Sequence, residues 1–144
     1  MTETAGPGLE LVEVSRGAAF GDIDNDGDVD IVVTNNNGPA RLLLNEAGSR
    51  HHWLLVRLEA AKGNRLAMAA EVGVFRQGEN PMWRRAHTDG SYLSASDIRV
   101  HFGLGDKPEI EALVVRWPDG TKEKWGTVRA DRIVTLRQGT GQPA

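Results

Sequence analysis

Five aspartates at alternate positions in a nine-residue stretch are the side chains best placed to do chemistry. They are Asp22, Asp24, Asp26, Asp28 and Asp30. No lysine or arginine lies between Arg16 and Arg41, so nothing nearby is expected to neutralise them. Like charges packed this tightly repel one another unless a cation lies among them. Many carboxylate oxygens favour Ca²⁺ over zinc or copper. The stretch is interpreted as a calcium loop, with a solvated acidic hairpin as the alternative.

The spacing gives the members of this acidic loop, residues 22–30, distinct roles. When the chain curls around an ion, the first three aspartate side chains can converge on one point. Gly27 permits the positive φ of a sharp turn. The carbonyl oxygen of Asp28 then points inward, and Asp30 closes the site with one or both carboxylate oxygens. The expected ion is Ca²⁺, and its expected ligands are Asp22, Asp24, Asp26, Asp28 and Asp30.

An EF-hand loop begins with the same alternation, but the flanking residues here predict strands. The EF-hand ends in a glutamate at its twelfth position and lies between two helices. The twelfth residue here is Val33, and residues 29–34 are rich in β-branched side chains. The site is therefore expected to be a strand–turn–strand calcium loop.

The bulk composition is that of an ordinary folded domain. The chain has 144 residues, of which 40% are hydrophobic and 26% charged, enough for one core. Its net charge is −3, and the loop aspartates account for more than this excess. Lysine and arginine are scattered, with no cluster denser than Arg84-Arg85, so neither a nucleic acid nor a membrane surface is expected as a partner.

The sequence carries no redox or targeting signal. Cysteine is absent, so disulfides do not indicate a compartment. No apolar stretch is long enough to span a bilayer, and residues 1–10 lack a basic region followed by an apolar run. Neither a membrane segment nor a signal peptide is expected in this chain.

Recurrent glycine, asparagine and aspartate turn signals predict an all-β chain. The expected fold is a sandwich-like or partial-barrel domain of short antiparallel strands with one calcium hairpin. Residues 65–70 form a short helical candidate, and residues 138–144 are expected to fray. Strands are expected at residues 12–20, 29–34, 40–45, 52–59, 71–76, 82–88, 99–103, 112–117, 122–125 and 132–137.

Motifs along the chain point to a family. Residues 18–33 have the pattern A-A-F-G-D-x-D-x-D-G-x-x-D-I-x-V. This run resembles an FG-GAP (VCBS-type) repeat, the calcium-loop unit of integrin-like β-propellers. Further motifs then occur in order, and together they resemble the ASPIC/UnbV domain of the cartilage acidic protein-like family. They are Asn45 with His52-Trp53-Leu54, Gly90-Ser91-Tyr92-Leu93-Ser94, Val100-His101-Phe102-Gly103-Leu104-Gly105, Val115-Arg116-Trp117-Pro118-Asp119-Gly120 and Asp131-Arg132-Ile133.

The resemblance divides the chain into four segments. Residues 1–14 form an N-terminal tail or first strand, and residues 15–48 form a single FG-GAP-like repeat. Residues 49–138 form an ASPIC/UnbV-like β domain, and residues 139–144 form a tail. Within residues 64–72 the sequence departs from relatives, which usually have an acidic residue and a glycine there.

The resemblance also implies a function. It implies a calcium-binding, non-enzymatic recognition or structural module of a secreted bacterial protein, extracellular or periplasmic. A lone repeat cannot close a propeller and leaves strand edges unpaired. Three arrangements would resolve this: the chain is the tail of a longer protein, the repeat packs on the C-terminal module as an extra hairpin, or two chains supply edges to each other. A protein or glycan ligand, or a second copy of the chain at those edges, is the expected partner. Asp28 matches the backbone-carbonyl position of the repeat, and its side-chain ligand positions fall on Asp22, Asp24, Asp26 and Asp30.

Two catalytic alternatives stay open. A carboxylate-bound metal with an open position could hydrolyse phosphate or carboxylate esters. Ser91, Ser94 or Ser96 could act as a nucleophile with His87 or His101. No Gly-x-Ser-x-Gly elbow is present, however, and serines that cap a polar turn explain the segment more simply.

Histidines and tryptophans suggest two further sites. The four histidines lack the spacing of a zinc site, which makes zinc the weaker interpretation; they are His51, His52, His87 and His101. Trp117 and Trp125 flank a hairpin and are expected to face each other in the core. If exposed, this pair would offer a platform for a sugar ring, as in a carbohydrate-binding module.

Overall fold

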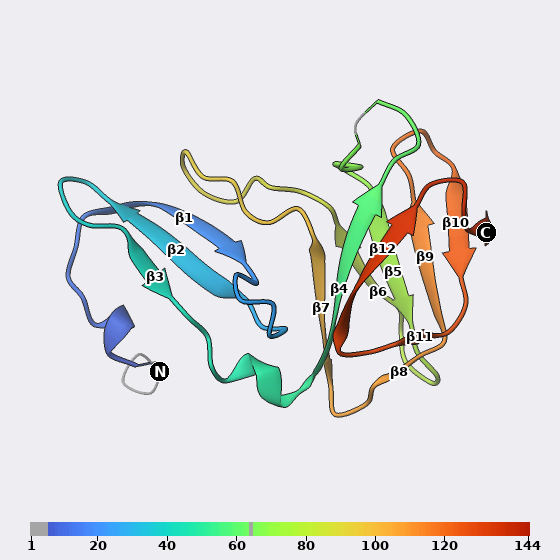
Figure 1. The fold of residues 1–144 in the computed structure, drawn as a ribbon, viewed down its shortest axis with the longest axis horizontal. Helices are drawn as coiled ribbons and strands as arrows, with labels where there is room; N and C mark the ends of the chain where they lie inside the picture. The colour runs from blue at the N-terminus through green and yellow to red at the C-terminus, as the bar shows by residue number, and fades with distance from the viewer. Residues whose placement is uncertain (1–5, 64) are drawn as a thin grey trace.

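The structure is a computed structural model that describes residues 6–63 and 65–144. Its strands form two bodies that lie side by side in Figure 1. The N-terminal body is an antiparallel sheet in the order β1-β2-β3, formed by Ser15–Gly21, Asp30–Asn35 and Arg41–Leu43. Short 3₁₀ helices precede and follow it, at Pro7–Leu9 and Gly48–Arg50.

The C-terminal body contains two larger sheets and one short strand pair. One sheet has the order β12-β4-β7, from Arg132–Arg137, His52–Glu59 and Val100–Gly105. The other has the order β13-β10-β9-β5-β6, from Gln142–Pro143, Lys122–Trp125, Ala112–Arg116, Glu71–Phe75 and Met82–Arg85. The short pair consists of β8 (Glu109–Ile110) and β11 (Val128–Arg129).

The hydrophobic core lies between the two larger sheets. Successive side chains of a strand point to opposite faces. Alternate residues of β4, namely Leu54, Val56 and Leu58, therefore enter the core together. They meet further buried side chains from β7, β5 and β9, which are Val100, Phe102, Leu104, Val72, Val74, Leu113 and Val115.

The opposite face of β4 and β7 is turned toward the N-terminal body. Trp53 and Leu55 alternate with the core residues of β4, and His101 does so on β7. Leu55 pairs with His101 across the two strands. It is 2% exposed although it lies outside the core cluster, and it lines the same cleft as Val29 of the N-terminal body.

The N-terminal body has no apolar interior of its own. Among its described residues, 6–48, no hydrophobic side chain is buried. The buried side chains there are those of three aspartates, Asp22, Asp28 and Asp30. Leucines of β3 and its flank are instead half-exposed. The buried side chains described in this body are therefore all charged.

The expected all-β, sandwich-like fold is confirmed, and none of the described sheets closes into a barrel. The expectation of antiparallel strands throughout was wrong for β12, which pairs with β4 in parallel from Arg132↔Leu54 onward. A parallel pair needs a long crossover, and the strands of the second sheet provide it. Asp131 sets the start of the pair, because its N–H donates to the carbonyl of Trp53 (2.7 Å).

Two local expectations were also wrong. Residues 138–144 do not fray, since β13 pairs with β10 and the Gly139 N–H donates to Glu123 (2.8 Å). Residues 65–70 form turns rather than a helix, with Ala67 and Ala69 at φ values of 46° and 74°. Alanine rarely adopts this left-handed conformation, so the sequence carries no ordinary signal for it.

The tryptophan pair lies in the core, as expected. The rings of Trp117 and Trp125 make an edge contact at 6.4 Å, and Trp117 is only 3% exposed. The indole N–H of Trp117 donates to Glu123 (3.0 Å). The pair therefore offers no exposed platform for a sugar.

Two side-chain truncations test whether the apolar core lies in the C-terminal body and not around β3. Leu113→Ala removes a fully buried side chain and is expected to cost about 2–5 kcal/mol of unfolding free energy. Leu42→Ala, the matched control, removes a side chain that is 52% exposed and is expected to cost about 0.5 kcal/mol or less. Urea unfolding measures both. Equal costs would contradict the absence of an apolar interior around β3.

Candidate metal centre

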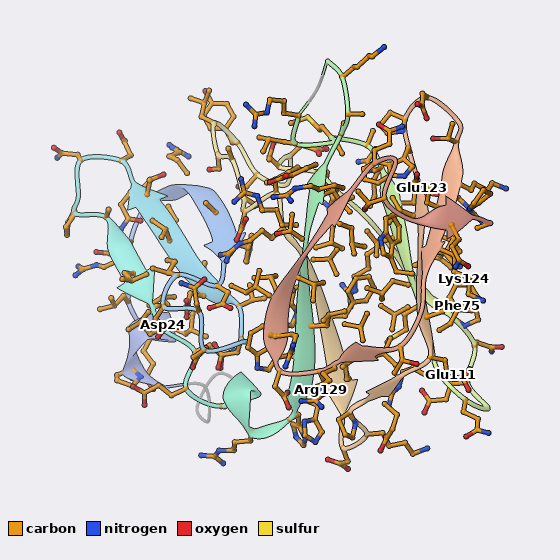
Figure 2. All side chains as sticks on the ribbon, turned by 45° about the vertical axis from the view of Figure 1, so that its right-hand side comes forward. Asp24, Phe75, Glu111, Glu123, Lys124 and Arg129 are labelled. Atoms are coloured by element: carbon orange, nitrogen blue, oxygen red, sulfur yellow. The ribbon has the colours of Figure 1, made fainter. Side chains whose placement is uncertain are left out.

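The acidic loop joins β1 to β2 and extends toward the C-terminal body (Figures 1 and 2). Carboxylate oxygens of Asp22, Asp24 and Asp30 lie within 4.8 Å of one another. Asp22 and Asp30 are buried, whereas Asp24, labelled in Figure 2, is exposed. Within the described residues, no other group of three or more acidic, histidine or cysteine side chains converges in this way.

The other two expected ligands lie outside this group. Asp26 is exposed, and its carboxylate accepts the N–H of Asp28 (3.1 Å). Asp24 likewise accepts the N–H of Asp26 (3.3 Å), so the middle of the loop is a chain of aspartate turns. Asp28 is buried against Gly48, where an added Cβ would lie 2.5 Å from the Asp28 Cβ. The metal-binding roles of Asp26 and Asp28 stay predictions.

Asp22 gives the strongest chemical indication of a cation. Its Oδ2 accepts the N–H of Gly27 (3.2 Å), but its Oδ1 is buried and accepts no hydrogen bond. Burial raises the pKa of the Asp22 carboxyl, although the N–H groups of Gly27 and Asn25 and the charge of Arg99 act in the opposite direction. A buried carboxylate oxygen without a partner is costly. Calcium coordinated by oxygens at this point would satisfy it.

Asp30 links the start of the loop to the segment that follows β3. Its Oδ2 accepts the N–H of Ile23 (2.9 Å), and its Oδ1 accepts the N–H of Asn45 (2.9 Å). The side chain is 1% exposed. Each carboxylate oxygen has a second lone pair, so these bonds leave Asp30 able to coordinate a metal.

Arg99 supplies the positive charge that the local sequence lacks. Its guanidinium donates to the carbonyl of Asp22 and to Oδ1 of Asn25, both at 2.7 Å. It also pairs with Asp97 at 2.5 Å. The expectation that nothing nearby neutralises the aspartates was therefore wrong, because Arg99 comes from the segment just before β7. One arginine that is already paired with Asp97 leaves most of the loop charge unbalanced.

Gly27 lies between two side chains of the C-terminal body. The imidazole Nε2 of His101 donates to its carbonyl (2.8 Å). On the other side, a Cβ added at Gly27 would lie 1.9 Å from the indole nitrogen of Trp53. Gly27 also has a φ of 102°, a conformation that glycine adopts readily. The turn thus needs glycine for both its backbone shape and its close packing.

A second contact between the bodies involves the serine segment. In Figure 1 the chain after β6 crosses over to β1 before it returns to β7. The hydroxyl oxygens of Ser91 and Ser96 accept the N–H groups of Ala18 (3.1 Å) and Phe20 (3.2 Å). The Asp97 N–H donates to the carbonyl of Phe20 (2.8 Å). This segment covers the edge of β1 that would otherwise be unpaired.

These contacts give the serines a structural role. The Ser94 hydroxyl donates to the carbonyl of Tyr92 (3.0 Å). His87 contacts Asp89 (3.1 Å), and none of the hydrogen bonds found among the described residues joins it to a serine. The remaining histidines bind separate partners: His51 contacts Asp106 (3.0 Å) and His52 contacts Asp131 (2.7 Å). No zinc group forms among the described histidines.

Comparison with known proteins identifies the family to which most of the C-terminal body is similar. The profile of the family described as "ASPIC and UnbV" matches residues 60–143. The chain belongs to the ASPIC and UnbV family. The matched segment contains β5 to β13 as well as Arg99 and His101, whereas the acidic loop precedes it.

Curated relatives of this ASPIC and UnbV protein are similar at low identity. Cartilage acidic protein 1 of Xenopus tropicalis is 30% identical over 107 residues, which is 72% of this chain and 16% of the relative. Cartilage acidic protein 1 of Homo sapiens is 27% identical over 125 residues, 83% of this chain and 19% of the relative. The chain thus spans less than a fifth of the length of these relatives.

Alanine at Gly27 tests the packing of the loop on Trp53. Gly27→Ala is expected to cost about 1–3 kcal/mol more than a glycine-to-alanine change that alters backbone strain alone. Gly120→Ala is the matched control, because Gly120 has a φ of 87° and a Cβ added there would have no heavy atom within 4 Å. Its own cost should be about 1–2 kcal/mol. Chemical unfolding compares the two, and equal costs would contradict the close contact with Trp53.

Proposed function

We propose that this chain is a calcium-stabilised, non-enzymatic recognition or structural module in which the ion holds the acidic loop against the C-terminal body. The observation that carries this proposal is the buried, unpartnered Oδ1 of Asp22 beside the carboxylates of Asp24 and Asp30. The resemblance of the loop sequence to an FG-GAP-type repeat supports this proposal. In this proposal Asp22, Asp24, Asp26 and Asp30 coordinate through side chains and Asp28 through its carbonyl.

The charge balance of the loop supports an ion of charge +2. Among the described residues, Arg99 is the arginine that binds the loop, and it also pairs with Asp97. Paired or metal-bound carboxylates are tolerated at a buried site, whereas isolated ones are not. Calcium accepts the mixture of side-chain and carbonyl oxygens that this loop offers.

The absence of a buried apolar side chain in residues 6–48 makes the ion structurally important. An ion that binds only the folded loop stabilises it by mass action. The loop in turn contacts Trp53, Arg99 and His101 of the C-terminal body. Calcium would therefore stabilise the contact between the two bodies as well as the loop.

Membership of the ASPIC and UnbV family indicates a non-enzymatic module. The serines that a hydrolase would use instead hold the edge of β1. The alternative with a serine nucleophile thus has no nucleophile–base pair to favour it among the described residues. Metal-dependent hydrolysis of phosphate or carboxylate esters needs no such pair, and it stays the alternative to this proposal.

An extracellular setting fits this proposal. The relatives are named as acidic proteins of cartilage, and extracellular calcium modules have typical dissociation constants of about 10⁻⁴–10⁻³ M. The helices that the structure describes include none with the length and apolarity to cross a membrane. We propose that the protein is secreted and bacterial. Its partner is a protein, a glycan or a second copy of the chain. That partner binds at β3, where Leu42 and Leu44 are each 52% exposed.

Thermal unfolding of EDTA-treated protein, titrated separately with Ca²⁺, Mg²⁺ and Zn²⁺, tests the proposed function. At about 10 mM calcium the added stability should be about 1.4–2.7 kcal/mol, given the dissociation constants typical of such sites. The midpoint should rise clearly more with Ca²⁺ than with Mg²⁺. A larger response to Zn²⁺, or no response to any ion, would contradict the proposal.

A double variant assigns the response to the loop. Asp24→Ala with Asp26→Ala should abolish the calcium-dependent rise in the midpoint, because it removes two of the proposed ligands. The control, Glu109→Ala with Glu111→Ala, removes the same charge from exposed positions of the C-terminal body; Figure 2 shows Glu111 far from the loop. The control should respond as the wild type does. An undiminished response of the loop variant would mean that calcium binds elsewhere.

A further inference from the structure

A cleft of about 390 Å³ lies between the two bodies, beside the acidic loop. The N-terminal body contributes Phe20 and Asp22 to its lining, and the C-terminal body contributes Arg84, Arg85 and Arg99. Arg84 and Arg85 end β6, which is the edge strand of the five-stranded sheet. The densest pair of positive residues in the sequence therefore lines this cleft, and the calcium proposal gives that pair no role.

The cations of the cleft differ in how well they are neutralised. Arg99 forms a close pair with Asp97. Arg85 lies 3.8 Å from Asp89, at the outer limit of an ion pair. Arg84 takes part in none of the ion pairs found among the described residues; its guanidinium instead lies 5.7 Å from the ring centroid of Phe102. Positive charge on this wall is thus incompletely balanced.

The opposite wall is apolar in part. Phe20 is 42% exposed and lines the cleft together with Val29 of the same body. Small-molecule sites combine such apolar surface with a few placed polar groups, and volumes of about 300–1,000 Å³ are typical. A ligand that fits must therefore carry a negative group for the arginines and an apolar face for Phe20.

We propose that this cleft binds an acidic saccharide unit, whose carboxylate or sulfate contacts Arg84, the cleft arginine without an ion pair among the described residues, while one face of the sugar ring packs on Phe20. Arginine suits both anions because its planar guanidinium donates two parallel hydrogen bonds. This inference rests on the proposed calcium site in one respect: the ion neutralises Asp22, which would otherwise repel the anion from the cleft wall.

Binding of defined oligosaccharides to the whole chain in saturating calcium tests the proposal. The probes are an oligogalacturonate for carboxylate, a sulfated dextran oligomer for sulfate and unmodified dextran of the same length as the neutral control. Calorimetry or ligand-observed NMR should show binding of at least one acidic probe, weakening as salt is added, and none of the neutral one. The acidic probe that binds shows whether the cleft prefers carboxylate or sulfate. Equal binding of the neutral probe, or binding of poly-glutamate in place of both acidic probes, would overturn the proposal.

Charge-removing variants locate the site. Arg84→Gln with Arg85→Gln should weaken binding of the acidic probe at least about tenfold, since the charge-assisted hydrogen bonds of Arg84 and the positive charge of Arg85 beside the cleft are lost. Lys122→Gln with Lys124→Gln removes the same charge from exposed positions of β10, and should bind as the wild type does. Equal binding by both double variants would overturn the proposal.

Two further measurements separate loss of the binding site from loss of folding or of calcium binding. Arg84→Lys keeps the charge and the fold but loses the planar donor pair, so it should bind more weakly than the wild type even if the double variant does not fold; unchanged binding would contradict the role of Arg84. The calcium-dependent rise in the thermal unfolding midpoint is recorded on the same samples. A normal calcium response without probe binding overturns the saccharide site alone, whereas loss of the calcium response overturns the proposed function itself.

Discussion

The buried carboxylates of the acidic loop are the constraint on which the rest of the structure depends. In the described part of the N-terminal body the buried side chains are Asp22, Asp28 and Asp30, where a free-standing sheet would have valine or leucine. Burying charge is unfavourable unless each group is paired, hydrogen-bonded or bound to a metal. Hydrogen bonds satisfy Asp30, but Oδ1 of Asp22 accepts none. This arrangement is consistent with a sheet whose interior is completed by a cation.

The C-terminal body supplies side chains that contact the acidic loop. Because side chains alternate along β4 and β7, one face of these strands builds the hydrophobic core and the other presents Trp53, Leu55 and His101 to the loop. Arg99 then binds the loop backbone. A cation that stabilises the loop also stabilises these contacts, and the contacts in turn preform the loop for the cation. By linkage the two effects must be equal in free energy.

Sequence patterns predicted what is local and missed what is distant. The alternation of aspartates around Gly27 predicted a turn that gathers carboxylates, and the structure brings Asp22, Asp24 and Asp30 together. The hairpin spacing predicted the contact of Trp117 with Trp125. Arg99 was missed, because it follows Asp22 by more than seventy residues and no local pattern links them. The parallel pairing of β12 with β4 was missed for the same reason. The positive φ of Ala69 has no signal, since alanine does not favour it.

Amide hydrogen exchange of the whole chain, with saturating calcium and with EDTA, tests the central account most directly. Removal of calcium should speed exchange in β1 and β2 (Ser15–Gly21 and Asp30–Asn35) while β4, β5 and β9 of the core keep their protection. This result would show that the cation stabilises the N-terminal sheet in place of an apolar interior. Unchanged exchange in β1 and β2, or equal loss of protection in both bodies, would contradict the account.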